Sequence, residues 1–102
     1  MIEIVKYGAS WCGPCRAMDS MLTRLKEEYP DIPIRSVDVE SPEGEEACKD
    51  YKIFAVPTTL GFVDGKVASR TTGVSTYEAL KGIVTNLQTI EAGKAASTLN
   101  HE

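Results

Sequence analysis

Hydrophobic and polar positions in the first half of the chain predict a strand, a helix and a second strand. Residues 2–7 form a short apolar, β-branched run, which is typical of a buried strand. Residues 12–29 carry apolar side chains at intervals of three and four with charged residues mostly between them, which indicates an amphipathic helix. Pro30 ends that helix, and residues 34–39 form a second β-type run. A helical crossover of this kind makes the two strands parallel.

The second half of the chain predicts a short helix, a hairpin and a last helix. Residues 41–51 begin with Ser-Pro and several acids, which suit the start of a helix. The runs 59–63 and 66–72 flank an Asp-Gly pair, which favours a tight turn between antiparallel strands. Apolar residues recur at helical spacing over residues 76–91, after a Ser-Thr cap.

The order β-α-β-α-β-β-α predicts an α/β fold with a four-stranded mixed sheet and helices on both faces. A chain of 102 residues is long enough for one such domain. We assign the domain to residues 1–91 and expect the small, polar residues 92–102 to form a frayed or disordered tail.

Composition excludes several classes of protein. A net charge of −4 without a basic stripe argues against a nucleic-acid binder. No apolar run approaches the length of a membrane span. The first residues lack the pattern of a secretory signal, so we expect a cytoplasmic protein, and a monomer.

The chemistry is concentrated in Cys12 and Cys15, which are two residues apart at the predicted change from strand to helix. The bend there allows a disulfide, and the helix start favours a thiolate, so we expect Cys12 to attack and Cys15 to resolve the mixed disulfide. Zinc is an alternative, but only Cys48 and His101 remain as further soft or nitrogen ligands, and four are needed. A further alternative is that Cys12 and Cys15 are buried structural cysteines. We interpret Cys48 as a small apolar contact.

The run Trp11-Cys12-Gly13-Pro14-Cys15, with Val56-Pro57-Thr58 later in the chain, closely resembles the thioredoxin family. The resemblance covers about residues 2–91 and implies a minimal thioredoxin fold, because the family's usual first strand and helix are missing. It implies a dithiol that reduces protein disulfides, without metal or bound cofactor, in electron transport and cell redox homeostasis. It also implies a cis bond before Pro57 and an apolar docking surface, which would comprise Trp11, Gly13, Pro14, Val56, Pro57, Gly73 and Val74.

The same resemblance implies partners. Electrons would come from an upstream reductase such as thioredoxin reductase, and ribonucleotide reductase is one candidate substrate. An oxidase or isomerase of disulfides is the alternative within the enzyme class, although the Gly-Pro pair between the cysteines resembles that of reductants. A binding subunit of a larger complex is the alternative outside it.

Lys6 departs from the family pattern. It lies six residues before Cys12, where the family has a buried acid thought to help deprotonate the resolving thiol. Ser36 lies near the place of the basic residue that often pairs with that acid. Lys6 could therefore move the redox potential toward oxidation or replace the acid as base. Alternatively, it reaches solvent or pairs with Asp38 or Glu40.

Overall fold

The computed structural model describes the backbone of residues 1–100 and the side chains of residues 1–93. Its elements follow the predicted order β-α-β-α-β-β-α, which confirms the fold class. Their bounds are β1 (Ile2–Gly8), α1 (Gly13–Glu28), β2 (Ile34–Asp38), α2 (Pro42–Asp50), β3 (Thr58–Val63), β4 (Lys66–Thr72) and α3 (Tyr77–Asn100).

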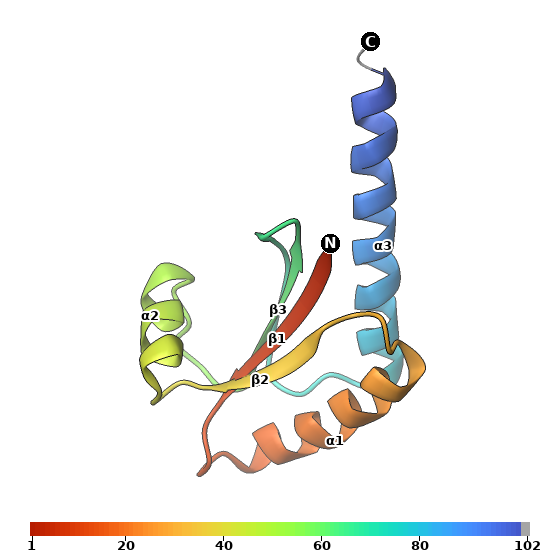
Figure 1. Cartoon of the computed structure of the whole chain (residues 1–102). Coiled ribbons are helices and arrows are strands. Elements are labelled where there is room, and N and C mark those ends of the chain that lie inside the picture. Colours follow the sequence, from red (N-terminus) through yellow and green to blue (C-terminus); the bar gives the residue numbers. More distant parts are fainter. Residues whose placement is uncertain (101–102) are drawn as a thin grey trace.

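The sheet has four strands in the order β2-β1-β3-β4. β1 pairs with β2 in parallel and with β3 antiparallel, and β3 pairs antiparallel with β4, so the sheet is mixed as predicted. β1 therefore lies inside the sheet, with hydrogen-bonded neighbours on both sides (Figure 1). The chain leaves the end of β1 and leads directly into α1. Residues at that end of β1 are therefore fixed by β2 on one side and β3 on the other.

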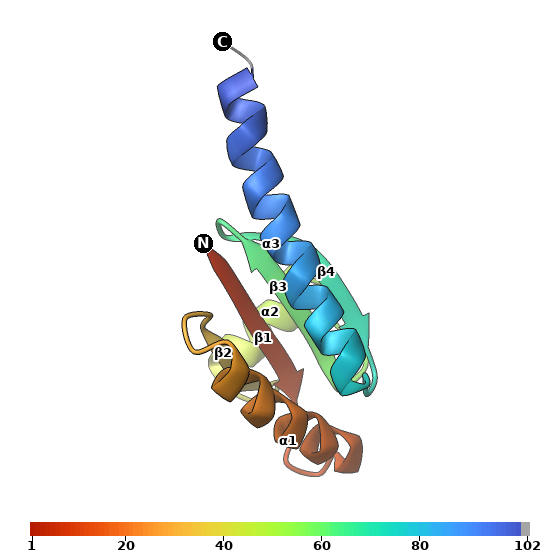
Figure 2. The same ribbon diagram turned by 90° about the vertical axis from the view of Figure 1, so that its right-hand side faces the viewer.

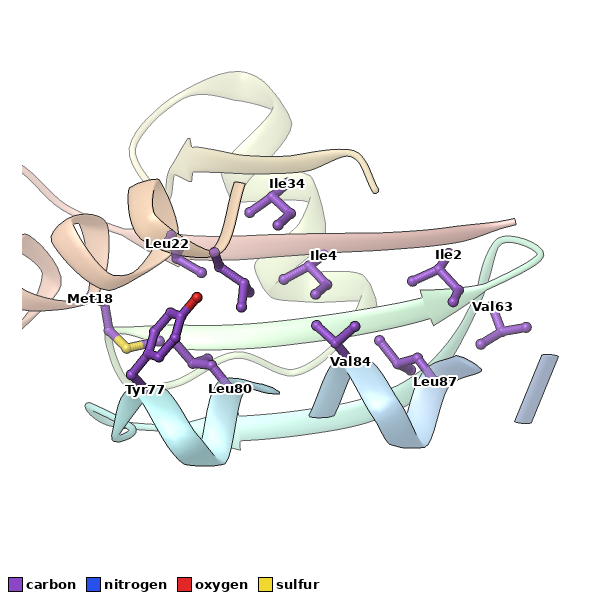
Figure 3. Close-up of a cluster of buried hydrophobic side chains, with 11 residues drawn as sticks. Ile2, Ile4, Met18, Leu22, Ile34, Val63, Tyr77, Leu80, Val84 and Leu87 are labelled. Atoms are coloured by element: carbon purple, nitrogen blue, oxygen red, sulfur yellow. The ribbon is translucent and has the colours of Figure 1, made fainter. Parts of the chain in front are cut away.

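Helices cover both faces of the sheet (Figures 1 and 2). Alternate residues of β1 point to opposite faces. Ile2 and Ile4 pack in the larger core with α1 and α3, which Figure 3 shows, whereas Val5 and Tyr7 pack in the core on the α2 side. Lys6 lies two residues after Ile4, so the strand period directs it to the α1 face.

The predicted caps are present at the starts of α2 and α3. The Ser41 hydroxyl accepts a hydrogen bond from the amide of Gly44 at 3.1 Å, and the Thr76 hydroxyl accepts one from the amide of Ala79 at 3.1 Å. Each satisfies an amide at a helix start that has no partner inside the helix. The sequence pattern therefore located both helix starts within one residue.

The last helix is longer than the sequence predicts. We expected it to end at residue 91, but α3 continues to Asn100. Residues 92–96 include three alanines and a lysine, which have high helix propensity, and this outweighs Gly93. The limit of the domain at residue 91 stays a prediction, and His101 lies outside the described residues. Within those residues, no helix has the length and apolar character needed to cross a membrane.

Candidate active site

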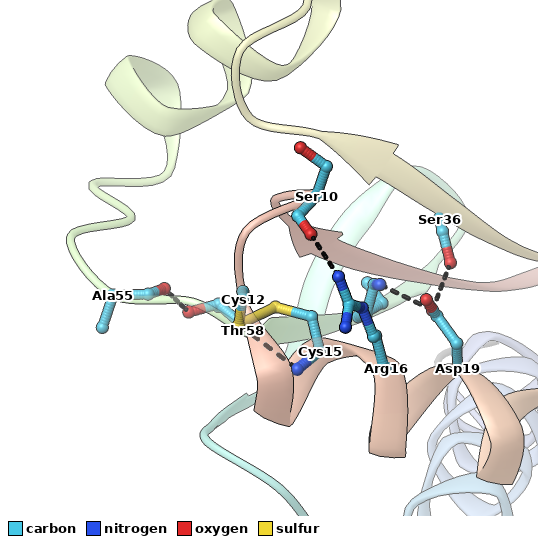
Figure 4. Close-up of a disulfide and its surroundings, with 9 residues drawn as sticks. Ser10, Cys12, Cys15, Arg16, Asp19, Ser36, Ala55 and Thr58 are labelled. Carbon is cyan, nitrogen blue, oxygen red and sulfur yellow. Dashed lines mark hydrogen bonds and ion pairs between the residues drawn. A yellow bond between two sulfur atoms is a disulfide. The ribbon is translucent and has the colours of Figure 1, made fainter.

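Cys12 and Cys15 lie at the start of α1, directly after the loop that leaves β1 (Figure 4). The amide of Cys12 donates to the carbonyl of Ala9 at 3.1 Å, which closes the turn between strand and helix. Pro14 lies in the first turn of α1, where a proline is tolerated because an amide hydrogen there would have no acceptor inside the helix. The two cysteines form a disulfide with their Cα atoms 5.3 Å apart.

Cys12 is the N-cap residue of α1. Its Sγ accepts a hydrogen bond from the amide of Cys15 at 3.2 Å. After reduction, the same amide and the positive end of the helix would favour a Cys12 thiolate over the thiol. In the disulfide form both side chains are nearly buried, with Cys12 5% and Cys15 2% exposed. The geometry is that of a reversible dithiol–disulfide pair at a helix start.

The residues expected to form the docking surface differ in burial and contacts, and their role in docking stays a prediction. Val56 packs against the cysteine pair, and the Val56–Pro57 bond is cis, as the resemblance implies. Pro57 is fully buried, so its ring adds no exposed surface. Its carbonyl accepts a hydrogen bond from the amide of Gly73 at 2.8 Å, which ties the loop after β4 to the loop before β3. The side chains of Trp11 and Val74 are 68% and 48% exposed.

Phe54 is a surface residue that the sequence analysis missed. Its side chain is 89% exposed, the largest exposed fraction among the large hydrophobic residues of the described chain. It borders a cavity of about 220 Å³ on the Cys12 side of the molecule. The signal was available, because Ile53, Phe54 and Ala55 form an apolar run between two predicted elements. The cavity is lined by Trp11, Val39, Cys48, Ile53, Phe54, Ala55 and Val56.

Lys6 is buried and paired behind the cysteines, so the alternative that it reaches solvent or pairs with Asp38 or Glu40 is wrong, while its role in the chemistry stays a prediction. Its side chain is 5% exposed, and its Nζ lies 2.6 Å from Oδ1 of Asp19. The hydroxyl of Ser36 donates to the same Asp19 oxygen at 3.1 Å. Asp38 lies on the same face of the sheet as Lys6, but its carboxylate accepts a hydrogen bond from the amide of Glu40 at 2.8 Å, whereas Asp19 reaches Lys6 from α1.

Gly8 is a second residue that the sequence analysis missed. A Cβ placed on Gly8 would lie 2.9 Å from Sγ of Cys15 and 3.1 Å from Nζ of Lys6. The two atoms therefore share the space above this glycine, and no larger residue fits there without a shift. Asp19 could have been found from its spacing, since positions i and i+4 on a helix are neighbours and Asp19 follows Cys15 by four.

A cavity of about 300 Å³ lies beside this pair. It is bordered by Lys6, Gly8, Ala9, Ser10, Asp19, Ser36, Val37 and Asp38. Asp19 is 49% exposed, so the cavity connects the buried end of Lys6 with the surface.

Cys48 lies on α2, apart from the pair, and is half-buried against the α2-side core. Within the described residues, no three His, Cys, Asp or Glu side chains are placed to hold a metal ion together.

Comparison with known proteins agrees with this geometry. The model of the family described as Thioredoxin matches residues 2–86. A curated relative, the protein named thioredoxin of Chlamydia trachomatis, is 29% identical over 87 residues, which are 85% of this chain and 83% of that protein. Thioredoxin O, mitochondrial, of Oryza sativa subsp. japonica is 39% identical over 69 residues, which are 68% of this chain but only 40% of the rice protein.

Solved structures show the same likeness. The X-ray structure of Fasciola hepatica thioredoxin superposes with a TM-score of 0.74 at 33% identity. The match covers 83% of this chain and 79% of that one.

Proposed function

We propose that this chain, which belongs to the thioredoxin family, is a protein-disulfide reductase that cycles between a Cys12/Cys15 dithiol and a Cys12–Cys15 disulfide. The family membership and the paired cysteines establish a thiol–disulfide oxidoreductase. The observation that carries the exchange chemistry is the position of Cys12 as N-cap of α1, where a backbone amide already faces its sulfur. The Gly13-Pro14 pair between the cysteines, which resembles that of reductants, supports the reducing direction. A thiolate held there is ready to attack a disulfide at neutral pH.

The proposed cycle has two exchange steps. The Cys12 thiolate attacks one sulfur of the substrate disulfide, a Cys12–substrate disulfide forms, and the other substrate sulfur leaves as a thiolate that takes up a proton. Cys15 then loses its proton and attacks Sγ of Cys12, which releases the second substrate sulfur. Two electrons pass from the dithiol to the substrate, and an upstream reductase such as thioredoxin reductase would restore the dithiol.

Exposed apolar side chains support docking of a polypeptide substrate on the Cys12 side. Trp11, Phe54 and Val74 are all substantially exposed. Trp11 precedes Cys12 and shares a cavity with Phe54, and Val74 follows Gly73, whose amide bonds the carbonyl of Pro57. An exposed apolar group beside a reactive centre favours a partner that covers it. An unfolded or extended protein segment carrying a disulfide fits this surface better than a small thiol does.

Insulin reduction tests the activity. The reduced protein should cleave insulin disulfides in the presence of an excess of dithiothreitol, and both Cys12→Ser and Cys15→Ser should remove turnover. A reduction potential below that of glutathione would support the reductase. A potential near or above it would instead favour the oxidase or isomerase, and the buried Lys6 ammonium is the group that favours that outcome, because it stabilises thiolates.

The partners and the location are also proposals. A reductant of this kind acts in a reducing compartment, and we propose the cytoplasm, monomeric action, and ribonucleotide reductase as one protein substrate. A double Cys12→Ser/Cys15→Ser variant separates this from the binding subunit, since a subunit would complement a deletion strain and a reductase would not. Cell fractionation and size-exclusion chromatography test the other two statements.

A further inference from the structure

We propose that Lys6 and Asp19 together set the proton affinity of the resolving thiol, Cys15, and that the cavity beside them is the route of its proton to solvent. In this assignment the Lys6 ammonium stabilises the Cys15 thiolate, and Asp19 is a positioning residue that holds the ammonium and moderates its field. The inference rests on the proposed reductase cycle, and concerns only its second step.

The first argument is proximity. Nζ of Lys6 and Sγ of Cys15 border one small space, because a single Cβ on Gly8 would approach both to about 3 Å. A charge this close to a sulfur of 2% exposure acts through protein more than through water. The ammonium therefore lowers the free energy of a thiolate on Cys15 relative to the thiol.

The second argument is the free-energy cost of burying the charge of Lys6. Lys6 follows Ile2 and Ile4 on the same face of β1, where an apolar side chain would pack without desolvating a charge. A buried ion pair is generally no more stabilising than apolar residues of similar volume. The pair is therefore poorly explained by folding stability, and its place beside the reacting sulfur gives it a chemical use.

The third argument is the route to solvent. The groups that face the cavity are Lys6 from β1, Asp19 from α1, and Ser36 and Asp38 from β2. From β3, Thr59 pairs with Lys6 across the sheet, and its buried hydroxyl has no hydrogen-bond partner among the described residues. Thr59 does not titrate in this range, and Cys12 is bonded to the substrate in this step. The charges near Cys15 are therefore Lys6, Asp19 and Asp38 at the cavity, and Arg16 of α1, whose guanidinium donates to the carbonyl of Ser10 at the cavity edge.

The step balances without a further reactant. The Cys15 thiol releases its proton across the space at Gly8, which borders both Sγ of Cys15 and the cavity, and from the cavity the proton reaches bulk solvent. The resulting thiolate attacks Sγ of Cys12, the Cys12–Cys15 bond forms, and the bond from Cys12 to the substrate breaks. The electron pair of that bond leaves with the substrate sulfur.

Stopped-flow reaction of the reduced protein with 4,4′-dithiodipyridine tests this. All proteins in the test, the wild type included, carry Cys48→Ala, which removes the third thiol, so that the reagent reports Cys12 and Cys15 separately. Attack by Cys12 releases one thiopyridone, and resolution by Cys15 releases the second. The pH dependence of each rate is measured for the wild type, Lys6→Met and Asp19→Asn. Lys26→Met, which removes an exposed lysine at the other end of α1, is the matched control.

We expect the two variants to move the second step in opposite directions. Lys6→Met removes a positive charge and should shift the midpoint of the rate profile to higher pH, with resolution about tenfold slower at pH 7. Asp19→Asn keeps an oxygen for the ammonium but removes a negative charge, so its midpoint should shift to lower pH. The double variant should return toward the wild type.

The first release should change by no more than about twofold in all variants, since it depends mainly on the helix start. Shifts of the same sign in both variants, or shifts no larger than that of Lys26→Met, would overturn the proposal. Should Lys6→Met fail to fold, Lys6→Gln and Asp19→Asn carry the same comparison. If instead the wild type released only one thiopyridone, the reductase cycle itself would be wrong.

Discussion

The two sides of the disulfide differ in chemistry and in origin. The Cys12 side is an apolar surface with Trp11, Phe54 and Val74 exposed. The Cys15 side is a cavity with a buried lysine and a half-exposed aspartate. The first side suits contact with a protein substrate and the second suits movement of a proton. One disulfide can thus have a nucleophile and a resolving thiol governed by separate surroundings.

The two sides also differ in which parts of the chain surround the cysteine. The properties of Cys12 depend on amides of the next few residues, because it caps its own helix. The surroundings of Cys15 come from β1, α1 and β2, with Lys6 and Asp19 separated by 13 residues and Asp19 and Ser36 by 17. The following predictions test whether the two sides are independent.

The largest effect should come from the cysteines themselves. Cys12→Ser should lower the rate of insulin reduction by a factor of about 10³ or more, because the attacking thiolate is lost. Cys15→Ser should retain the attack but stop at the mixed disulfide, which intact-mass spectrometry would detect as a covalent adduct. An adduct on Cys15 in the Cys12→Ser variant at a comparable rate would contradict the division of roles.

Gly8→Ala should disturb the Cys15 side through sterics. The added Cβ would lie 2.9 Å from Sγ of Cys15, so we expect the oxidised protein to lose about 1–3 kcal/mol of unfolding free energy in urea denaturation. Gly82→Ala is the control, since a Cβ there meets nothing within 4 Å and the position is helical. That control should gain about 0.5–1 kcal/mol. Equal effects at both positions would mean that the space above Gly8 is not tight.

Substituting the two residues of the Lys6–Asp19 pair should lower the free energy of unfolding by unequal amounts. Asp19→Asn leaves a buried ammonium without its carboxylate and should cost about 1–2 kcal/mol of stability, reduced from the fully buried case because Asp19 is half exposed. Lys6→Met removes the buried charge, and its stability should stay within about 1 kcal/mol of the wild type. Urea denaturation at pH 7 measures both. The reverse order would show that the pair is held for stability.

Trp11→Ala should act on the Cys12 side alone. With 68% of this side chain exposed, we expect unchanged stability. The KM for insulin should rise by about three- to tenfold, which corresponds to about 1 kcal/mol of lost docking contact. Both release rates with dithiodipyridine should stay as in the wild type. A change in the second release would mean that the two sides are coupled.

Glu28, at the other end of α1, should affect neither side. Hydrogen bonds from Tyr77 at 2.7 Å and from Lys81 at 3.0 Å hold the pKa of this carboxyl below its ordinary value of 4.5. A lowered pKa adds stability that is present above pH 4.5 and is lost as the pH falls through the folded-state pKa. Glu28→Gln should therefore lower the Tm slightly at pH 7, with a difference that shrinks as the pH falls. Both thiol release rates should remain unchanged, and a difference in Tm that persists at low pH would contradict the electrostatic cause.

Local patterns predicted most of the fold. The apolar, β-branched run of β1, the Asp-Gly turn and the capping residues Ser41 and Thr76 all have their effect within a few residues, and the structure confirms them. The predicted end of α3 at residue 91 was wrong, because the high helix propensity of alanine extends the helix where small polar residues suggested a tail. Phe54 also went unnoticed, because its short apolar run lies between two predicted elements and follows neither a helical nor a strand period.

The sequence alone determined the cysteine pair, its place at a helix start and the order of the elements, because spacing, capping and hydrophobic period act along the chain. Only the tertiary structure decided what surrounds Cys15. A strand residue can face either layer of helices, and which charge it meets depends on the packing of α1 against the sheet. Lys6 therefore pairs with Asp19 from α1, although Asp38 borders the same cavity, and the absence of a side chain on Gly8 leaves space for the ammonium beside the sulfur. Contacts of that kind depend on distances across the fold, which sequence separation does not encode.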